Sequence, residues 1–238
     1  MTRRRWIADE VSGNRAALTG THADHLVRVL RAHVGQEFDI VANGLVRHGR
    51  IVSITDGRVD FELAEEISAQ PSIATLTLLL AVFKFDRMEW AIEKCTELGV
   101  TRVVPVITRR TVSHLAAAAV KRAERWRRIA LQASEQSRRA TPPDISAPQK
   151  LRDALAIPAA VKVVLSESEQ QIRLSDAFSG SNASNVLLAV GPEGGWASDE
   201  LQLFEDAGWI SASLGSTVLR SETAAIAATA IALAELNR

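Results

Sequence analysis

The segment VLLAVGPEGGWASDE, residues 186–200, joins an apolar run to a turn that contains three glycines and the carboxylate of Glu193. Glycines at the end of a strand let the backbone approach a ligand closely, and ligands of open α/β sheets bind beside the carboxyl ends of the strands. The turn at 191–195 lacks both G-x-G-x-x-G and G-x-x-x-x-G-K-[ST] spacing, which argues against NAD and P-loop nucleotide chemistry. It predicts a backbone-lined ligand site, and a plain turn before a helix capped by Ser198 is the alternative interpretation.

A second segment, SLGSTVLRSETAAIAATAIALAEL at 213–236, places Arg220 directly before a helix that begins near Ser221. Arginine at a helix N-terminus opposes the helix dipole, so we expect Arg220 to meet an anion or a carboxylate partner. Ser221 and Glu222 stand where N-terminal capping residues belong. The alanine-rich helix suits close packing on a sheet or on a second copy of the chain.

Both segments belong to a region in which apolar runs alternate with helical patterns. The strands are expected at 73–83, 102–107, 161–167, 186–190 and 210–215, and the helices at 86–99, 116–139, after Ser198 and from Ser221. Gly99 is expected to end the first of these helices. Such alternation predicts a parallel sheet covered by helices, which is the α/β class.

The residues before Glu66 have a different texture. Short runs, EFDIVANG, LVRHGRIVSITDG and RVDFELAEE, are separated by turn residues at Asn43–Gly44 and Asp56–Gly57. This pattern predicts a small antiparallel β unit built from hairpins. The stretch ISAQPS at 67–72 has no clear period and contains a proline, so we interpret it as a linker.

Composition narrows the class of protein further. The 238 residues carry 28 Lys plus Arg and 28 Asp plus Glu, and 47% are hydrophobic, as in ordinary globular proteins. A single cysteine, Cys95, excludes an internal disulfide and suits a reducing compartment, so we expect a cytoplasmic protein. The basic start of the chain is not followed by an apolar core of signal-peptide length, and no apolar window is long enough to cross a bilayer, so neither a signal peptide nor a membrane span is expected. The histidines lack zinc-type spacing, and no metal is expected. We predict that Cys95 is a buried thiol and that Trp90 and Trp126 anchor a core or an interface.

The neutral total hides a basic segment. Residues 109–139 contain nine basic and two acidic side chains, a net charge of +7. Arginine predominates, and its planar guanidinium suits phosphate oxygens and can stack on bases. The segment therefore favours RNA binding, and a solvated helix face is the alternative interpretation.

Several motifs in order resemble one known family. KCTELGV at 94–100, GPEGG, LGSTVLRSETA and RVVPVITRRTVSH, together with ERWRRIALQASEQSRR and the early RRRWIA and HLVRVLR, resemble the RsmE family of ribosomal RNA methyltransferases, in the SPOUT superfamily. The resemblance spans nearly the whole chain. It implies a PUA-like RNA-binding β-barrel over residues 1–70 and a methyltransferase domain over 73–238, whose parallel sheet carries a C-terminal trefoil knot.

The resemblance also implies an activity. It is S-adenosylmethionine-dependent methylation at N3 of one uridine in 16S ribosomal RNA of the small subunit, performed by a homodimer. Two alternatives stay open: a methyltransferase of the same fold that acts on another RNA such as tRNA, and a non-catalytic RNA-binding factor in ribosome assembly.

The family's roles map onto particular residues of this chain. Cofactor binding is implied for Leu165, Ser166, Glu167, Gly191, Pro192, Glu193, Gly194, Gly195, Leu214, Gly215, Val218 and Leu219. RNA binding is expected at Arg4, Arg5, His25, Arg28, Arg31, Arg109, Arg110, Arg138 and Arg139. For catalysis we expect Arg220 to stabilise the negative charge on the uridine, and Glu193 to hold the cofactor's ammonium or to orient Arg220. Trp196 is expected either to stack on the target base or to serve in packing.

Overall fold

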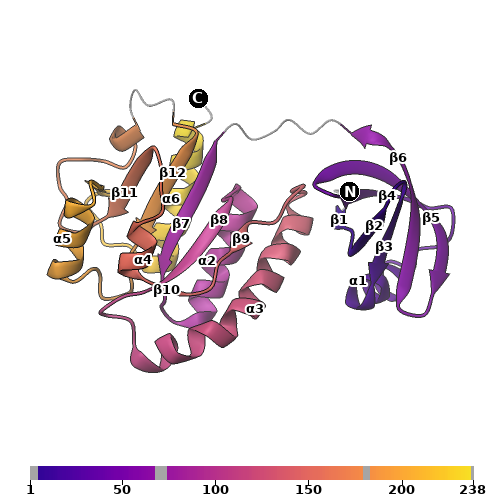
Figure 1. Ribbon diagram of the computed structural model, residues 1–238, viewed down its shortest axis with the longest axis horizontal. Coiled ribbons are helices and arrows are strands. Elements are labelled where there is room, and N and C mark those ends of the chain that lie inside the picture. Colours follow the sequence, from indigo (N-terminus) through magenta and orange to yellow (C-terminus); the bar gives the residue numbers. More distant parts are fainter. Residues whose placement is uncertain (1–4, 68–73, 179–182, 237–238) are drawn as a thin grey trace. The chain divides into compact units, whose positions relative to one another are not determined.

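A computed structural model of the chain describes residues 5–67, 74–178 and 183–236, which divide into two compact units (Figure 1). The N-terminal unit contains the described residues up to Ile67 and the segment Ser134–Thr141, and the remaining described residues form the C-terminal unit. The association of Ser134–Thr141 with the first unit is not indicated by the sequence. Apart from Ile67, the predicted linker lies outside the described residues.

The N-terminal unit is built on a six-stranded sheet with the order β1-β4-β5-β6-β3-β2. Its strands are β1 Trp6–Ile7, β2 Glu10–Ser12, β3 Arg15–Thr19, β4 Glu37–Ala42, β5 Leu45–Thr55 and β6 Arg58–Ile67. The two predicted hairpins are confirmed, and Asn43 and Gly44 both have positive φ, 53° and 78°, as a tight hairpin turn requires. The purely antiparallel prediction is wrong for β1, which pairs in parallel with β4.

A short helical segment, α1 Gly20–Asp24 followed by the π-helical turn η1 His25–Val29, closes one side of this unit. It buries Leu26 against a core that includes Trp6, Ile40 and Phe61. This segment is not evident in the sequence because five-residue helices are too short to show a helical period.

The C-terminal unit alternates strands and helices. Its elements are β7 Thr75–Ala81, α2 Phe85–Leu98, β8 Arg102–Ile107, α3 Ser113–Gln136, β9 Asp144–Ile145, β10 Gln149–Lys150, α4 Leu151–Leu155, β11 Val161–Leu165, the 3-10 turn η2 Asp176–Phe178, β12 Asn185–Val190, α5 Ser198–Asp206, β13 Ile210–Ala212 and α6 Ser221–Leu236. Every strand pair in its seven-stranded sheet is parallel, in the order β10-β8-β7-β12-β11-β13 with β9 beside β8. The predicted α/β class is confirmed.

Helices cover both faces of this sheet (Figure 1). Leu78 and Leu80 of β7 face a core formed with α2, α3 and α6, whereas Leu79 and Ala81 face a second core formed with α4 and α5. Because both faces are buried, the strands read as continuous apolar runs in the sequence.

Most predicted helix boundaries hold. Gly99 ends α2 with φ 122°, and α6 begins at Ser221 as expected. The long helix begins and ends three residues earlier than predicted, at 113 and 136. The prediction that Ser198 caps α5 is wrong: the N-cap residue is Ala197, whose backbone N–H donates to Glu200 Oε2 at 3.0 Å. A glutamate three residues into the helix therefore does the capping that a serine was expected to do.

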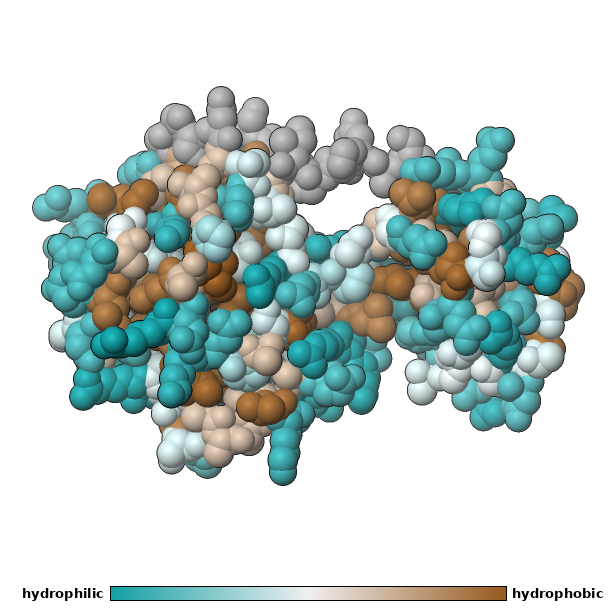
Figure 2. Space-filling view, viewed as in Figure 1, coloured by the Kyte–Doolittle hydropathy of each residue, from teal (hydrophilic) through white to brown (hydrophobic). Residues whose placement is uncertain are grey.

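Among the described helices, none has the length and apolarity needed to cross a bilayer. On the face of the C-terminal unit seen in Figure 2, hydrophilic residues are interspersed with hydrophobic ones. Trp126 lies fully inside the core, as predicted, whereas Trp90 is 48% exposed and is no part of that core.

Candidate functional site

Three loops that leave the carboxyl ends of β11, β12 and β13 enclose a cavity of about 330 Å³. These strands are neighbours in a parallel sheet, so their carboxyl ends meet at one edge. The loops contribute residues 165–168, 190–196 and 212–219, and Arg110, Leu201, Ser221 and Ala224 complete the wall. All twelve residues for which cofactor binding is implied line this cavity. The structure thus brings together loops that are separated by up to 54 positions in the sequence.

Trp196 joins its own loop, at 190–196, to the loop at 165–168. A Cβ atom on Gly191 would lie 3.1 Å from the indole nitrogen of Trp196, closer than ordinary side-chain contacts. The indole packs beneath that backbone, donates a hydrogen bond to the Leu165 carbonyl at 2.9 Å, and meets Phe204 edge to face at 4.8 Å. Trp196 is only 7% exposed, which favours the packing role of the two that were considered.

The cavity wall carries three charged side chains, Arg110, Glu167 and Glu193. The Arg110 guanidinium donates a hydrogen bond to the Gly194 carbonyl. A Cβ atom on Gly195, whose φ is +70°, would lie 3.6 Å from Glu167 Oε1 and 3.8 Å from Arg110 Nη1. One cation and one carboxylate therefore lie beside the glycine turn.

Glu193 forms an ion pair with Arg87, a residue that no sequence motif indicated. Its Oε1 lies 3.1 Å from Nη1 of Arg87, in the first turn of α2. The same guanidinium lies 3.7 Å from Glu222 at the start of α6, through Nε. The expected contact between Glu193 and Arg220 is not formed. No local pattern could have indicated Arg87, because 106 positions separate it from Glu193.

Arg220 is exposed and is not part of the cavity wall. Its chain neighbours Leu219 and Ser221 both line the cavity, so Arg220 lies at its margin. Within the described ranges its side chain forms no hydrogen bond or ion pair. The guanidinium is consequently available to a ligand.

Glu200, also missed in the sequence, is a buried carboxylate that joins two loops. One oxygen accepts the backbone N–H of Arg109 at 2.8 Å, and the other accepts the backbone N–H of Ala197 at 3.0 Å. This fixes the loop after β8 against the loop after β12. The Arg109 side chain, expected to bind RNA, instead pairs with the exposed Asp199.

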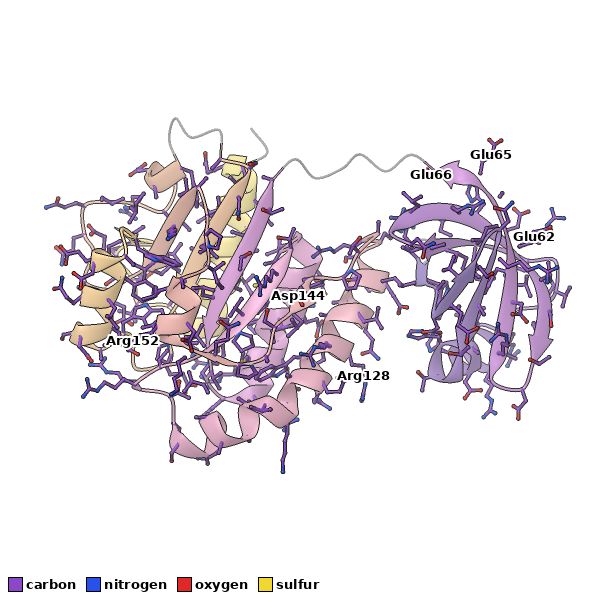
Figure 3. All side chains as sticks on the ribbon, viewed as in Figure 1. Glu62, Glu65, Glu66, Arg128, Asp144 and Arg152 are labelled. Atoms are coloured by element: carbon purple, nitrogen blue, oxygen red, sulfur yellow. The ribbon has the colours of Figure 1, made fainter. Side chains whose placement is uncertain are left out.

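Arg122 and Arg125 of the basic segment are neutralised locally. Both lie within hydrogen-bond distance of Glu89 of α2, which is mostly buried. Others remain in solvent, such as Arg128, whose side chain extends away from α3 (Figure 3). The run of positive charge is therefore partly an ion-pair network between helices.

Among the arginines expected to bind RNA, those near the start of the chain and those that follow α3 differ in their environments. Arg4 lies outside the described residues. Arg5 donates a hydrogen bond to the carbonyl of Arg138, whose own side chain is exposed. Burial lowers the pKa of Arg139. Of these, Arg138 is the most accessible to a phosphate.

The residues of the helical segment α1–η1 that are expected to bind RNA also differ in their exposure. The His25 ring packs against Trp6 with 5.7 Å between centroids and is half-buried. Arg28 and Arg31 are exposed, and Arg28 forms only a solvent-facing pair with Asp24 at 3.5 Å. The two arginines can reach a phosphate, whereas His25 contributes to packing.

Cys95 is buried, and its sulfur accepts a hydrogen bond from the Thr229 hydroxyl at 3.4 Å. Burial raises the pKa of this thiol from 9.0 to about 12, so it stays protonated, in agreement with the predicted inert role. In the part of the chain that the structure describes, no group of three or more His, Cys, Asp or Glu side chains could hold a metal ion.

The C-terminal part of the chain matches a known class of protein domain. The family model for the RNA methyltransferase domain matches residues 70–233, which include every loop of the cavity. This chain is thus an RNA methyltransferase-domain protein.

Whole-chain comparisons define the family more closely. The ribosomal RNA small subunit methyltransferase E of Mycobacterium bovis is 34% identical over 227 residues, 91% of this chain and 85% of that protein. Its counterpart in Rickettsia conorii is 35% identical over 190 residues, 76% and 73% of the two chains. The crystal structure of the Neisseria gonorrhoeae enzyme bound to S-adenosyl methionine has a TM-score of 0.86, 30% identity and 96% coverage of both chains. The chain belongs to the ribosomal RNA small subunit methyltransferase E family, as the sequence motifs indicated.

Proposed function

We propose that this chain methylates N3 of one uridine in 16S ribosomal RNA, with S-adenosylmethionine as the methyl donor. The observation that carries the proposal is the convergence of three loops, two of which contain glycine, on one cavity. The S-adenosyl methionine in the Neisseria gonorrhoeae relative supports the choice of donor, and the names of the relatives support the choice of RNA. The uridine N3 position rests on the family resemblance.

The cavity fits this cofactor in size and in charge. Its volume of about 330 Å³ is in the range of small-molecule sites. S-adenosylmethionine carries two positive groups, the sulfonium and the ammonium, and one carboxylate. The wall offers the opposite set, two carboxylates and one guanidinium. The glycines leave the backbone N–H and C=O groups of the loops accessible to a base or a sugar.

When bound, the cofactor supplies a methyl carbon that is already electrophilic. The chain's own residues then have to align the uridine nitrogen and stabilise the charge that remains when its proton leaves. We assign the second task to Arg220, whose guanidinium is unpaired within the described residues and adjoins the cavity wall. Glu193, fixed by Arg87 at 3.1 Å, presents a negative charge to the positive donor.

The proposal also covers the role of the N-terminal unit, the path of the C-terminal segment and the pairing of two copies of the chain. The N-terminal unit acts as a PUA-like RNA-binding barrel, with Arg28 and Arg31 contacting phosphates. The segment that ends in α6 is threaded as a trefoil knot. Two copies pair through α6, on which the less buried positions Thr223, Ala227, Ala230 and Ala234 form one stripe of small residues at helical spacing. Larger side chains there would keep a second helix at a distance.

Two measurements test the proposal. Isothermal titration calorimetry with S-adenosylmethionine examines the donor, and mass spectrometry of ribosomal RNA from cells with and without the gene examines the product. We expect binding in the first and loss of one N3-methyluridine from 16S RNA in the second. A missing methyl group in tRNA would support the alternative substrate, and absence of cofactor binding would favour a non-catalytic assembly factor.

A further inference from the structure

We propose that Arg110 and Glu167, which both lie beside Gly195, together hold the amino-acid end of the methyl donor, with Arg110 on its carboxylate and Glu167 on its ammonium. This inference rests on the proposed function and deepens it. It moves Arg110 from the RNA-binding role expected from the sequence to cofactor recognition.

The two charges are close enough to act on one ligand group. Glu167 Oε1 and Arg110 Nη1 lie 3.6 Å and 3.8 Å from the position of a Cβ atom on Gly195, so each is within 4 Å of a single point at the cavity wall. An α-amino acid carries its ammonium and its carboxylate on one carbon. A cation and an anion that both lie within 4 Å of such a point therefore match both of its charges.

The alternatives on the wall are already engaged. Glu193 is the second carboxylate of the cavity, and it forms an ion pair with Arg87. Glu167 has no hydrogen bond or ion pair with any part of the chain that the structure describes. Arg110 is the cation of the wall and uses one N–H group on the Gly194 carbonyl. Its remaining N–H groups can form the paired hydrogen bonds that a carboxylate accepts from guanidinium.

The loop that carries Arg110 is held in place before any ligand arrives. The preceding residue, Arg109, donates its backbone N–H to the buried Glu200 at 2.8 Å. On the same loop, the Thr108 and Thr111 hydroxyls lie 2.9 Å apart, and Thr111 also donates to the Val82 carbonyl at 3.3 Å. Because this backbone is fixed, little conformational freedom remains to be lost when the guanidinium binds an anion.

Ligands that differ only at the amino-acid end test the inference by calorimetry. S-adenosylhomocysteine has both charged groups, and 5′-methylthioadenosine has neither. We expect Arg110→Met to weaken S-adenosylhomocysteine binding about tenfold and 5′-methylthioadenosine binding less than about twofold. Glu167→Gln should give the same selective loss. Arg109→Met, which alters only the exposed pair with Asp199, is the matched control and should change neither affinity.

The outcomes separate this inference from the proposed function. If the unmodified chain binds neither compound nor S-adenosylmethionine, the proposed function and the inference are both wrong. If it binds them but Arg110→Met weakens both compounds equally, or neither, the assignment of Arg110 is overturned while the cofactor site stands. Decarboxylated S-adenosylmethionine, which lacks the carboxylate but keeps the ammonium and the sulfonium, should lose affinity with Glu167→Gln and not with Arg110→Met. The reverse pattern would also overturn the assignment.

Discussion

Arg87 of α2 forms an ion pair with the buried Glu222 at the start of α6, with 3.7 Å between Nε and Oε1. Glu222 is 4% exposed, and its other oxygen has no hydrogen-bond partner within the described residues. Because the same guanidinium also holds Glu193, one side chain connects the first turns of two helices to the wall of the cavity. The charge of Glu222 is tolerated in the interior because Arg87 and the N-terminus of α6 both oppose it.

Arg87→Met should therefore destabilise the chain. The substitution leaves a buried carboxylate without its cation, which costs about 1–3 kcal/mol in the free energy of unfolding. Urea unfolding followed by tryptophan fluorescence measures this loss.

The control for Arg87 is the double variant with Glu222→Gln. Glutamine at 222 removes the unpaired charge, so the double variant should be more stable than Arg87→Met alone. A double variant that is equally unstable or less stable would show that Arg87 acts through some contact other than Glu222.

The contact between Gly191 and Trp196 gives a second prediction. In Gly191→Ala the new methyl group lies about 3.1 Å from the indole nitrogen, so the indole must shift and its hydrogen bond to Leu165 is strained. We expect weaker S-adenosylmethionine binding, measured by calorimetry, and a loss of about 1–3 kcal/mol in unfolding free energy. Trp196→Phe removes the hydrogen bond and also part of the buried ring that packs on Phe204, so it should cost more than about 1 kcal/mol. If Gly191→Ala binds the cofactor normally, the joined loops are not needed for the site.

Glu200 and Asp199 are neighbouring carboxylates, one buried and one exposed, so the costs of neutralising them can be compared directly. Glu200→Gln places an NH₂ group against one of the two backbone N–H donors, of Arg109 or Ala197, and should cost about 1–3 kcal/mol in unfolding free energy. Asp199→Asn alters a solvent-exposed ion pair and should cost less than about 1 kcal/mol. Thermal unfolding of both variants at one pH provides the comparison. Equal costs would mean that the two backbone contacts of Glu200 contribute little.

The buried thiol of Cys95 predicts a dependence of stability on pH. Its pKa is about 12 in the folded chain and near the ordinary 9.0 in the unfolded chain. Above pH 9 the unfolded state loses a proton that the folded state keeps, so stability falls as the pH rises toward 12. Between pH 8 and pH 10 the chain should lose about 1.4 kcal/mol relative to Cys95→Ala, in which this term is absent. If the unfolding free energies of the two proteins changed with pH in parallel, the raised pKa of Cys95 would be contradicted.

The sequence predicts the sheet and the glycine turn of the cavity because their signals are local, whereas the loop at 165–167 is assigned to the site only by the family resemblance. Strands buried on both faces read as apolar runs such as 76–81, and the turn at 191–195 is recognised by its glycines. The helices of the C-terminal unit follow from apolar spacing and from stop signals such as Gly99. These elements needed no knowledge of distant contacts.

The charged network could not be predicted in the same way, because its partners come from different elements. Glu89 of α2 holds Arg122 and Arg125 of α3, which lie 33 and 36 positions away. From the sequence those arginines read as a free basic face. Likewise, β1 is too short to show that it pairs in parallel with β4, since strand direction depends on the path of the chain between them.

The position of Trp196 gives the chain an optical probe of its own. Of its five tryptophans, Trp196 is the one that lines the cavity, and the indole emission spectrum depends on what lies against the ring. A molecule that enters between the loops changes those surroundings, while the fully buried Trp126 supplies a constant background. Occupancy of the cavity can therefore be followed by fluorescence without a label on either the protein or the ligand.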